Sequence, residues 1–317
     1  MKLQSPIPKI LLPVDGSDHA KNAVQFAGCL GSLMGKGMTD FTVLYVMAGG
    51  FLSRHMANID FRTEVLMRSE AFKRIKEEHM EKDIMPLLDE AERILKATGA
   101  ENKIEKLIVD GDPANEIIQV ANKGDYSTII MARSGQTGTK GSLLGDVANK
   151  VIHTTSKQTV YIVGQRGMTD PSCPIPKILI PIDGSLYAMK GVHHASSLAS
   201  QFKGSLRGIT LLRIINLALY MERLKEGIDP EKEANKILNE GKDICLNAGV
   251  SEGLISTIIR TGKPAEEIQK EADEGDYSMI IMGRKGRTAF KDLILGGVSS
   301  AVLQRCPNQT IAIASGE

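Results

Sequence analysis

The chain has 317 residues, of which 42% are hydrophobic and 24% charged, with 31 glycines and 12 prolines. This composition is typical of a globular protein and excludes an intrinsically disordered chain, and the length is sufficient for two ordinary domains. The 39 basic and 38 acidic residues leave a formal net charge of +1, which excludes the basic field that gathers nucleic acid or an anionic membrane surface.

The amino terminus and the cysteines favour a cytoplasmic protein. The first residues, MKLQSPIPKILLP, lack the apolar run and cleavage site of a signal peptide, and no uncharged run of 18 apolar residues occurs. The cysteines form no CxxC pair and have no histidines at metal-ligand spacing; they are Cys29, Cys173, Cys245 and Cys306. We therefore expect free thiols in a reducing compartment and no metal site.

An internal repeat organises the chain. PIPKILLPVDGS begins at Pro6 and PIPKILIPIDGS at Pro174, so these segments are offset by 168 residues. GDYSTIIMARSG begins at Gly124 and GDYSMIIMGRKG at Gly275, so these are offset by 151 residues. The sequence therefore contains two copies of one domain, and the first copy has 17 more residues between these landmarks than the second.

The predicted domains are residues 1–164, the first copy, and residues 177–317, the second copy. Residues 165–176 between them are rich in turn formers and predict a linker.

Within each copy, short β-branched runs alternate with longer amphipathic stretches, which predicts parallel strands joined by helices. In the first copy the predicted strands are Ile10–Val14, Phe41–Val46, Ile104–Val109, Ser127–Ala132 and Thr159–Val163. In the second copy they are Ile178–Ile182, Gly208–Ile214, Leu254–Ile259, Met279–Gly283 and Thr310–Ala314. Five strands and four helices in each copy predict two doubly wound α/β domains.

The extra residues of the first copy fall in an arm, Phe61–Gly99. Its apolar residues recur at roughly helical spacing, and Pro86 is expected to kink or restart the helix because proline removes a backbone donor. Two interpretations remain open. The arm is either a surface helix that packs on its own sheet, or a segment that binds a partner or closes over a site.

Three segments of each copy are expected to meet at one edge of the sheet, because ligands of open α/β sheets bind beyond the carboxyl ends of the strands where the strand order reverses. The first segment is the turn after strand one, the second is the end of strand two, and the third is the glycine-rich loop after strand four. The residues of the first two are Pro13, Asp15 and Val46 in the first copy and Pro181, Asp183 and Ile214 in the second.

The chemistry of these segments suits a nucleotide. A carboxylate at a strand end can accept both hydroxyls of a ribose, a strand edge can pair with adenine, and glycines let amides approach phosphates at a helix amino terminus. Each part also has a structural explanation, since Asp-Gly-Ser can turn the chain and cap the next helix, and glycines can form a tight turn. Finding all three parts together in both copies favours the nucleotide.

The chain resembles a tandem universal stress protein over essentially its whole length. The similar residues are the PVDGS and PIDGS turns, the GDYSxIIM strands and the glycine loops that end in LLGDV and LILGGV. The resemblance implies, for each copy, a five-stranded parallel sheet with helices on both faces. It also implies that ATP-binding members carry a loop of glycine, two residues, glycine, nine residues, glycine, and then serine or threonine.

The second copy departs least from that loop. It keeps the three glycines but has Gly297 in place of the hydroxyl residue, which removes a hydrogen bond worth about 1.5–3 kcal/mol and weakens binding without forbidding it. The resemblance implies a site for ATP or another adenine nucleotide, with Mg²⁺, at Pro181, Asp183, Ile214, Met282, Gly283, Arg284, Gly286, Gly296, Gly297 and Val298. Arg284, Lys285 and Arg287 are candidates for phosphate contact, with solvated loop charge as the alternative.

The first copy departs more. Ala132 adds a methyl group at the first glycine position, and Asp146 places a carboxylate near the phosphates, where like charges about 4 Å apart cost a few kcal/mol. A weaker or empty site is therefore expected there, formed by Pro13, Asp15, Val46, Met131, Gly135 and Gly145.

Three functions remain open. The first is a stress-response regulatory protein that binds ATP mainly in the second copy, and the second is an interaction scaffold without nucleotide. The third, slow ATP hydrolysis, lacks an identifiable general base. We expect no catalytic residue and no metal site, including at His193-His194. The resemblance further implies that the last strands of the two copies pair within the chain, and that a homodimer is compatible with this arrangement.

Overall fold

The computed structural model describes residues 5–35, 39–48, 70–101, 103–135, 144–165, 177–202, 204–286 and 295–315. Arg287, Cys173, most of the linker and the start of the arm lie outside these ranges. The α/β fold class expected from the sequence is confirmed, and each predicted strand is present with ends that differ by at most two residues.

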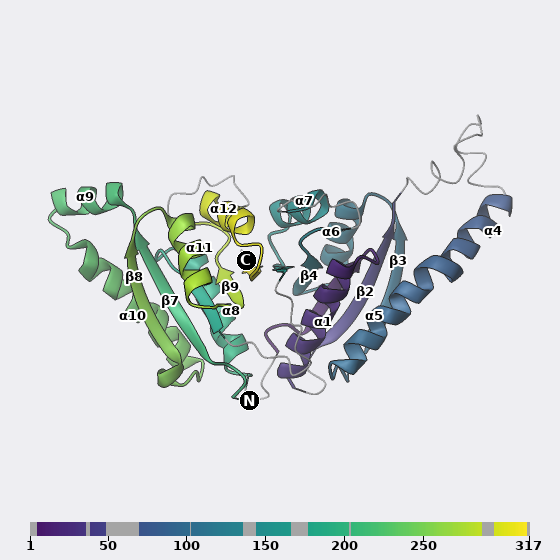
Figure 1. The fold of residues 1–317 in the computed structure, drawn as a ribbon, viewed down its shortest axis with the longest axis horizontal. Coiled ribbons are helices and arrows are strands. Elements are labelled where there is room, and N and C mark those ends of the chain that lie inside the picture. The colour runs from purple at the N-terminus through teal and green to yellow at the C-terminus, as the bar shows by residue number, and fades with distance from the viewer. Residues whose placement is uncertain are drawn as a thin grey trace.

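Ten strands form a single sheet. The first copy contributes β1 (Lys9–Val14), β2 (Asp40–Met47), β3 (Ile104–Asp110), β4 (Thr128–Ala132) and β5 (Thr159–Val163). The second contributes β6 (Lys177–Pro181), β7 (Gly208–Ile215), β8 (Ile255–Thr261), β9 (Met279–Met282) and β10 (Thr310–Ile313). The order is β3-β2-β1-β4-β5-β10-β9-β6-β7-β8. Neighbouring strands within a copy are parallel, whereas β5 and β10 are antiparallel, so the two halves lie side by side in one mixed sheet (Figure 1).

Helices cover both faces of this sheet. In the first copy they are α1 (Asp18–Leu33), α4 (Glu70–His79), the π-helix η1 (Met80–Ile84), α5 (Met85–Ala97), α6 (Pro113–Lys123) and α7 (Asp146–Thr154). In the second they are α8 (Leu186–Ala199), α9 (Leu217–Lys225), α10 (Pro230–Asn247), the 3₁₀ helix η2 (Glu252–Leu254), α11 (Pro264–Glu274) and α12 (Gly297–Arg305). The short α9 was not among the predicted helices.

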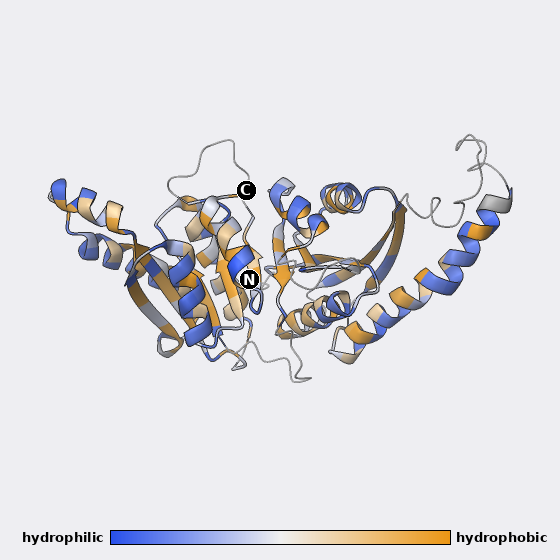
Figure 2. Ribbon diagram, turned by 45° about the horizontal axis from the view of Figure 1, so that its top comes forward, coloured by the Kyte–Doolittle hydropathy of each residue, from blue (hydrophilic) through white to orange (hydrophobic). Residues whose placement is uncertain are grey.

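The alternation of side chains along the strands divides the core in two. Ile10 and Leu12 of β1 face a layer with α1, α5, α8 and α10, while Leu11 faces a layer with α6, α7, α11 and α12. Figure 2 shows the strands largely in the colour of hydrophobic residues, as expected for strands that are buried on both faces. No helix in the described ranges has the length and apolar composition needed to cross a bilayer.

The described part of the arm, which begins at Glu70, is a continuous helix with two different halves. In α5, Leu88, Ala91 and Leu95 are buried against the sheet and α1, whereas α4 has no buried residue among its described side chains and projects past β3 in Figure 1. Pro86 lies in the first turn of α5, directly after the π-helix. The missing N–H of this proline is thus accommodated by a wider turn, and the predicted restart occurs without ending the helix.

The two copies meet around an approximate twofold axis. Tyr161 of β5 and Ala312 of β10 are equivalent positions of the repeat and pair with each other. The small Ala312 leaves room for the fully buried Tyr161 ring, which lies between Phe26 of α1 and His194 of α8, at centroid distances of 6.0 and 5.8 Å. If two first copies paired in this way, two Tyr161 side chains would compete for the same space. The Tyr161–Ala312 pair therefore favours contact between a first copy and a second copy.

We predict that His194 makes the stability of the chain depend on pH. Its Nε2 atom is hydrogen-bonded to the Tyr161 hydroxyl at 2.5 Å, and burial lowers the pKa of His194 from 6.5 to about 4. Between these pH values His194 binds a proton in the unfolded chain but not in the folded chain. The contribution of His194 therefore lowers the free energy of unfolding by about 3 kcal/mol as the pH decreases from 6.5 to 4.

The measurement is urea denaturation at several pH values, compared with His194→Phe, which copies the equivalent Phe26. The variant should lose this part of the pH dependence. An unchanged pH profile in the variant would contradict the prediction.

The cysteines need one correction. Cys245 and Cys306 are free and buried, as expected, but Cys29 is disulfide-bonded, and the other half of that bond lies outside the described residues. Distance along the sequence says nothing about proximity in space, and disulfide formation depends on the latter.

Candidate functional site

The candidate sites lie where the strand order reverses. In each copy the chain passes from the first strand to one side of the sheet and from the fourth strand to the other, and these two strands, β1 with β4 and β6 with β9, are neighbours. The turn after the first strand and the loop after the fourth therefore meet at the carboxyl edge of the sheet, which is where ligands bind in open α/β folds.

The carboxylate and the glycine loop are in contact in both copies. One oxygen of Asp183 accepts a hydrogen bond from the Ser185 amide at 2.9 Å, and the other lies 2.6 Å from where a Cβ atom on Gly286 would be. In the first copy an Asp15 oxygen lies 2.3 Å from the corresponding point on Gly135. A side chain at either glycine would displace the carboxylate, so these glycines hold the two segments together.

The structural explanation of the Asp-Gly-Ser turns is also correct. Ser17 and Ser185 are the N-caps of α1 and α8, and each hydroxyl accepts from an amide of its helix at 3.1 Å. The Ser17 hydroxyl also donates to Asp15 at 2.6 Å, whereas the Ser185 hydroxyl faces the Lys285 carbonyl at 3.4 Å. The serine hydroxyl thus donates to a different acceptor in each copy.

The ends of the second strands offer backbone groups to the same edge. The carbonyl of Ile215 accepts from Gly262 on the β8 side, while the carbonyl of Leu212 accepts from Ile182 on the β6 side. Because successive residues of a strand direct their backbone groups to opposite neighbours, Ile214 directs its N–H and C=O past the end of β6, toward Asp183. The carbonyl of Met47 accepts from Gly111, which gives Val46 the corresponding orientation.

The glycine loops close in the same way. The amide of Gly296 donates to the Arg284 carbonyl, and the amide of Gly145 donates to the Arg133 carbonyl, both at 2.8 Å. Gly296 and Gly145 are then the N-caps of α12 and α7 and have no side chain to occupy the free amides of the first turn. Each helix therefore presents its amino terminus, with its positive dipole end, to the candidate site.

The first residue of each helix distinguishes the copies. A Cβ atom on Gly297 would meet no atom of the described residues within 4 Å, so none of them occupies this position in the first turn of α12. The equivalent Asp146 is an exposed carboxylate in the first turn of α7, where it favourably interacts with the helix dipole. An anion would have to compete with Asp146 but not with Gly297.

The first glycine of the loop is explained by helix packing. A Cβ atom on Gly283 would lie 2.2 Å from the Tyr187 carbonyl oxygen of α8, and one on Gly191 would lie 3.0 Å from the Gly283 amide. In the first copy Ala132 stands at the position of Gly283 and Ala23 at the position of Gly191. Both members of this strand–helix contact therefore carry a methyl group in the first copy and none in the second. By this equivalence the Ala132 methyl faces the backbone of α1, so helix packing also accounts for the residue at this position.

Positive charge gathers beside the second loop. Tyr187 of α8 has the ammonium groups of Lys190 and Lys285 at 5.9 and 5.6 Å from its ring centroid. The equivalent residues of the first copy are His19, Asn22 and Ser134. Only Lys285 of this cluster was singled out from the sequence, because α8 residues are brought to the loop by the tertiary fold.

Arg284 has a different role from the predicted phosphate contact. It is 1% exposed, and its guanidinium donates to the carbonyls of Ile152 at 2.8 Å and Gln158 at 3.3 Å, both in the first copy. Burial lowers the pKa of Arg284 to about 10, so the group remains charged at neutral pH. The sequence alone does not indicate this role, because the acceptors lie more than 120 residues away in the sequence. The one available signal was that Arg133 occupies the equivalent position.

The remaining predicted residues line the base and rim of the sites. Met282 and Met131 are each 5% exposed, and their side chains belong to the core under the loops. Pro181 is buried and Pro13 half-buried at the strand ends, while Val298 is 40% exposed in the first turn of α12. No group of three metal-ligating side chains occurs among the described residues, which include His193 and His194.

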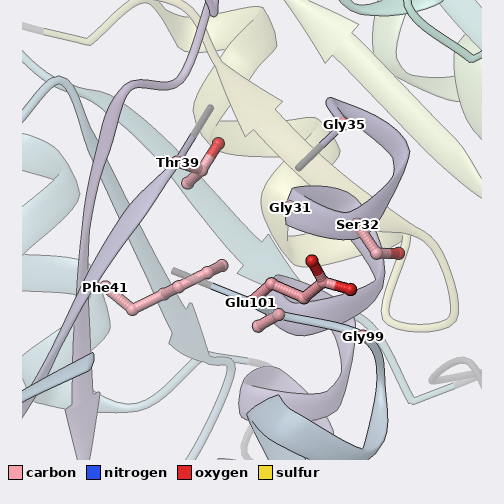
Figure 3. A pocket seen from close by; sticks show the side chains of 8 residues that line it. Gly31, Ser32, Gly35, Thr39, Phe41, Gly99 and Glu101 are labelled. Atoms are coloured by element: carbon pink, nitrogen blue, oxygen red, sulfur yellow. The ribbon is translucent and has the colours of Figure 1, made fainter. Parts of the chain in front are cut away.

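A separate pocket lies at the amino ends of the strands, opposite the carboxyl ends where the candidate sites lie. It has a volume of about 130 Å³ and is lined by Gly31, Ser32, Gly35, Thr39, Phe41, Gly99, Ala100 and Glu101 (Figure 3). These residues lie at the carboxyl ends of α1 and α5 and the start of β2, so the pocket is distant from both glycine loops.

Comparison with known families agrees with this geometry. The model of the universal stress protein family matches residues 6–163 and, a second time, residues 174–313. The chain belongs to the universal stress protein family. The resemblance inferred from the turns and glycine loops is thereby confirmed for both copies.

Individual relatives cover either one copy or both. The universal stress protein YxiE of Bacillus subtilis is 32% identical over 143 residues, which are 41% of this chain and 95% of that protein. A universal stress protein structure from Archaeoglobus fulgidus covers 99% of this chain and 100% of its own, with 21% identity and a TM-score of 0.66. A universal stress protein solved in complex with cAMP covers 45% of this chain and 98% of its own, with 19% identity and a TM-score of 0.33.

Proposed function

We propose that this universal stress protein is a regulatory protein that binds ATP, or another adenine nucleotide, in its second copy. The observation that carries the proposal is the contact between the Asp183 carboxylate and Gly286 beside the amino terminus of α12, whose N-cap Gly296 has no side chain. A carboxylate for the ribose and free amides for the phosphates then lie on one edge of the sheet, with Ile214 directing backbone groups toward the same place.

The residues at the equivalent positions make the first copy a poor site. Asp146 occupies the end of α7 where phosphates would bind, and Asn22 and Ser134 stand at the positions equivalent to Lys190 and Lys285. We therefore propose that the first copy is structural, and that Mg²⁺, when present, arrives with the phosphates of the nucleotide. The antiparallel contact of β5 with β10 lets the tandem chain act as its own dimer.

The alternative function is an interaction scaffold, and α4 is the observation that favours it. This helix is strongly charged, and its described side chains pack into no part of the core. In that case ATP would leave the stability unchanged, and removal of residues 61–79 would abolish the recovery of a partner. Slow ATP hydrolysis is the third candidate, since ATP is the proposed ligand, but no general base has been identified for it.

The decisive test is a calorimetric titration of the full chain with ATP. We expect saturable binding of one nucleotide per chain, and an increase in unfolding free energy of about 2.7 kcal/mol at 100 times the dissociation constant. Two equivalents would contradict the proposed difference between the copies, and no saturation at millimolar ATP would contradict the proposal as a whole.

A further inference from the structure

Arg284 holds the carboxyl end of a helix in the other copy. Its acceptor Ile152 lies in the last turn of α7, where carbonyls have no partner within the helix. The guanidinium satisfies this carbonyl and places positive charge at the negative end of the helix dipole. The contact is buried, so water does not compete for it.

Arg133 makes the reciprocal contact. It is 4% exposed and donates to the carbonyls of Leu303 and Cys306, at the carboxyl end of α12. The residue four positions after Leu303 is Pro307, which has no N–H to offer, so the Leu303 carbonyl depends on a donor from elsewhere. Leu303 and Ile152 are equivalent positions of the repeat, so the exchange follows the approximate twofold axis.

The backbone of the same two arginines holds the other end of each helix. The Arg284 carbonyl accepts from Gly296, the N-cap of α12, and the Arg133 carbonyl accepts from Gly145, the N-cap of α7. Each short helix is thus held at its amino end by the arginine of its own loop and at its carboxyl end by the arginine of the other loop. The four contacts form a closed ring that links Arg133, α12, Arg284 and α7.

We propose that Arg133, although it belongs to the copy expected to be empty, is a positioning residue for the nucleotide site of the second copy. The proposal rests on the proposed function for the location of the phosphates. The nine-residue helix α12 supplies the amides of that site, and Arg133 anchors its far end. Release of that end allows the helix to move relative to Gly286 and Asp183, and the amides lose their alignment.

The experiment compares ATP binding by the full chain in three variants. Arg133→Met should weaken ATP binding by roughly fivefold or more, within the range of coupling energies between distant sites, while one nucleotide still binds per chain. Arg133→Lys, which can reach one of the two carbonyls, should give an intermediate affinity. Tyr161→Phe removes an interdomain hydrogen bond on the opposite face of the sheet and should leave the affinity unchanged.

Hydrogen exchange without nucleotide gives an independent measurement. In Arg133→Met, the amides of the first turn of α12, next to Val298 and Ser299, should exchange faster than in the unaltered chain. A folded variant with unaltered affinity and unaltered exchange overturns the proposal. If the unaltered chain binds no ATP but exchange still rises in the variant, the proposed function fails, while the part of the inference in which Arg133 anchors α12 is supported. If Arg133→Met does not fold, the same two measurements on Arg133→Lys decide the question.

Discussion

Asp183→Ala lowers the affinity of the chain for ATP by at least about tenfold if this carboxylate accepts the ribose hydroxyls. Hydrogen bonds to a charged group contribute about 1.5–3 kcal/mol, and each 1.4 kcal/mol corresponds to a factor of ten in the dissociation constant. The carboxylate already lies against Gly286, with one oxygen used by the Ser185 amide. The measurement is calorimetric titration with ATP at constant ionic strength.

Two further variants separate binding from local structure. Asp183→Asn keeps an acceptor for Ser185 but removes the charge, so it should lose affinity with little effect on the turn. Asp15→Ala makes the equivalent change in the first copy and should leave ATP binding unchanged. Equal losses in Asp15→Ala and Asp183→Ala would contradict the assignment of the site to the second copy.

Arg284→Met should lower the free energy of unfolding by about 2–4 kcal/mol without any ligand present. The substitution preserves the apolar stem but leaves the carbonyls of Ile152 and Gln158 buried without their donor, and each such group costs about 1–3 kcal/mol. The measurement is equilibrium denaturation in urea, followed by circular dichroism.

Lys285→Met is the matched control, since it removes a neighbouring positive charge in the same loop. Its side chain is half-buried and its ammonium group lies over the Tyr187 ring of the same copy, so we expect a smaller loss of unfolding free energy than in Arg284→Met. If Arg284→Met instead weakened ATP binding and left the stability of the free protein unchanged, the phosphate-contact role expected from the sequence would be correct.

Much of the fold was predictable because it depends on local patterns that occur twice. The β-branched runs gave the strands, the offsets of the repeat aligned them, and the parallel order of an α/β sheet placed Asp183 and Gly286 on the same edge. Pro86 predicted a disturbance in the arm helix because proline lacks the N–H that would bond to a carbonyl one turn earlier. The short α9 was not predicted, although its apolar residues Leu217, Met221 and Leu224 recur at helical spacing; in the structure these side chains are exposed and do not join the core.

The sequence by itself determined the two copies, the fold class and the segments that meet where the strand order reverses. These follow from the internal repeat and from apolar residues that recur every two residues in strands and every three to four in helices. Only the tertiary structure decided what Arg284, Gly283 and His194 do. Arg284 binds carbonyls of the other copy, Gly283 accommodates the backbone of α8, and His194 meets Tyr161 across the axis. Their partners are distant in sequence, and no local pattern specifies which buried groups will meet when two sheets join.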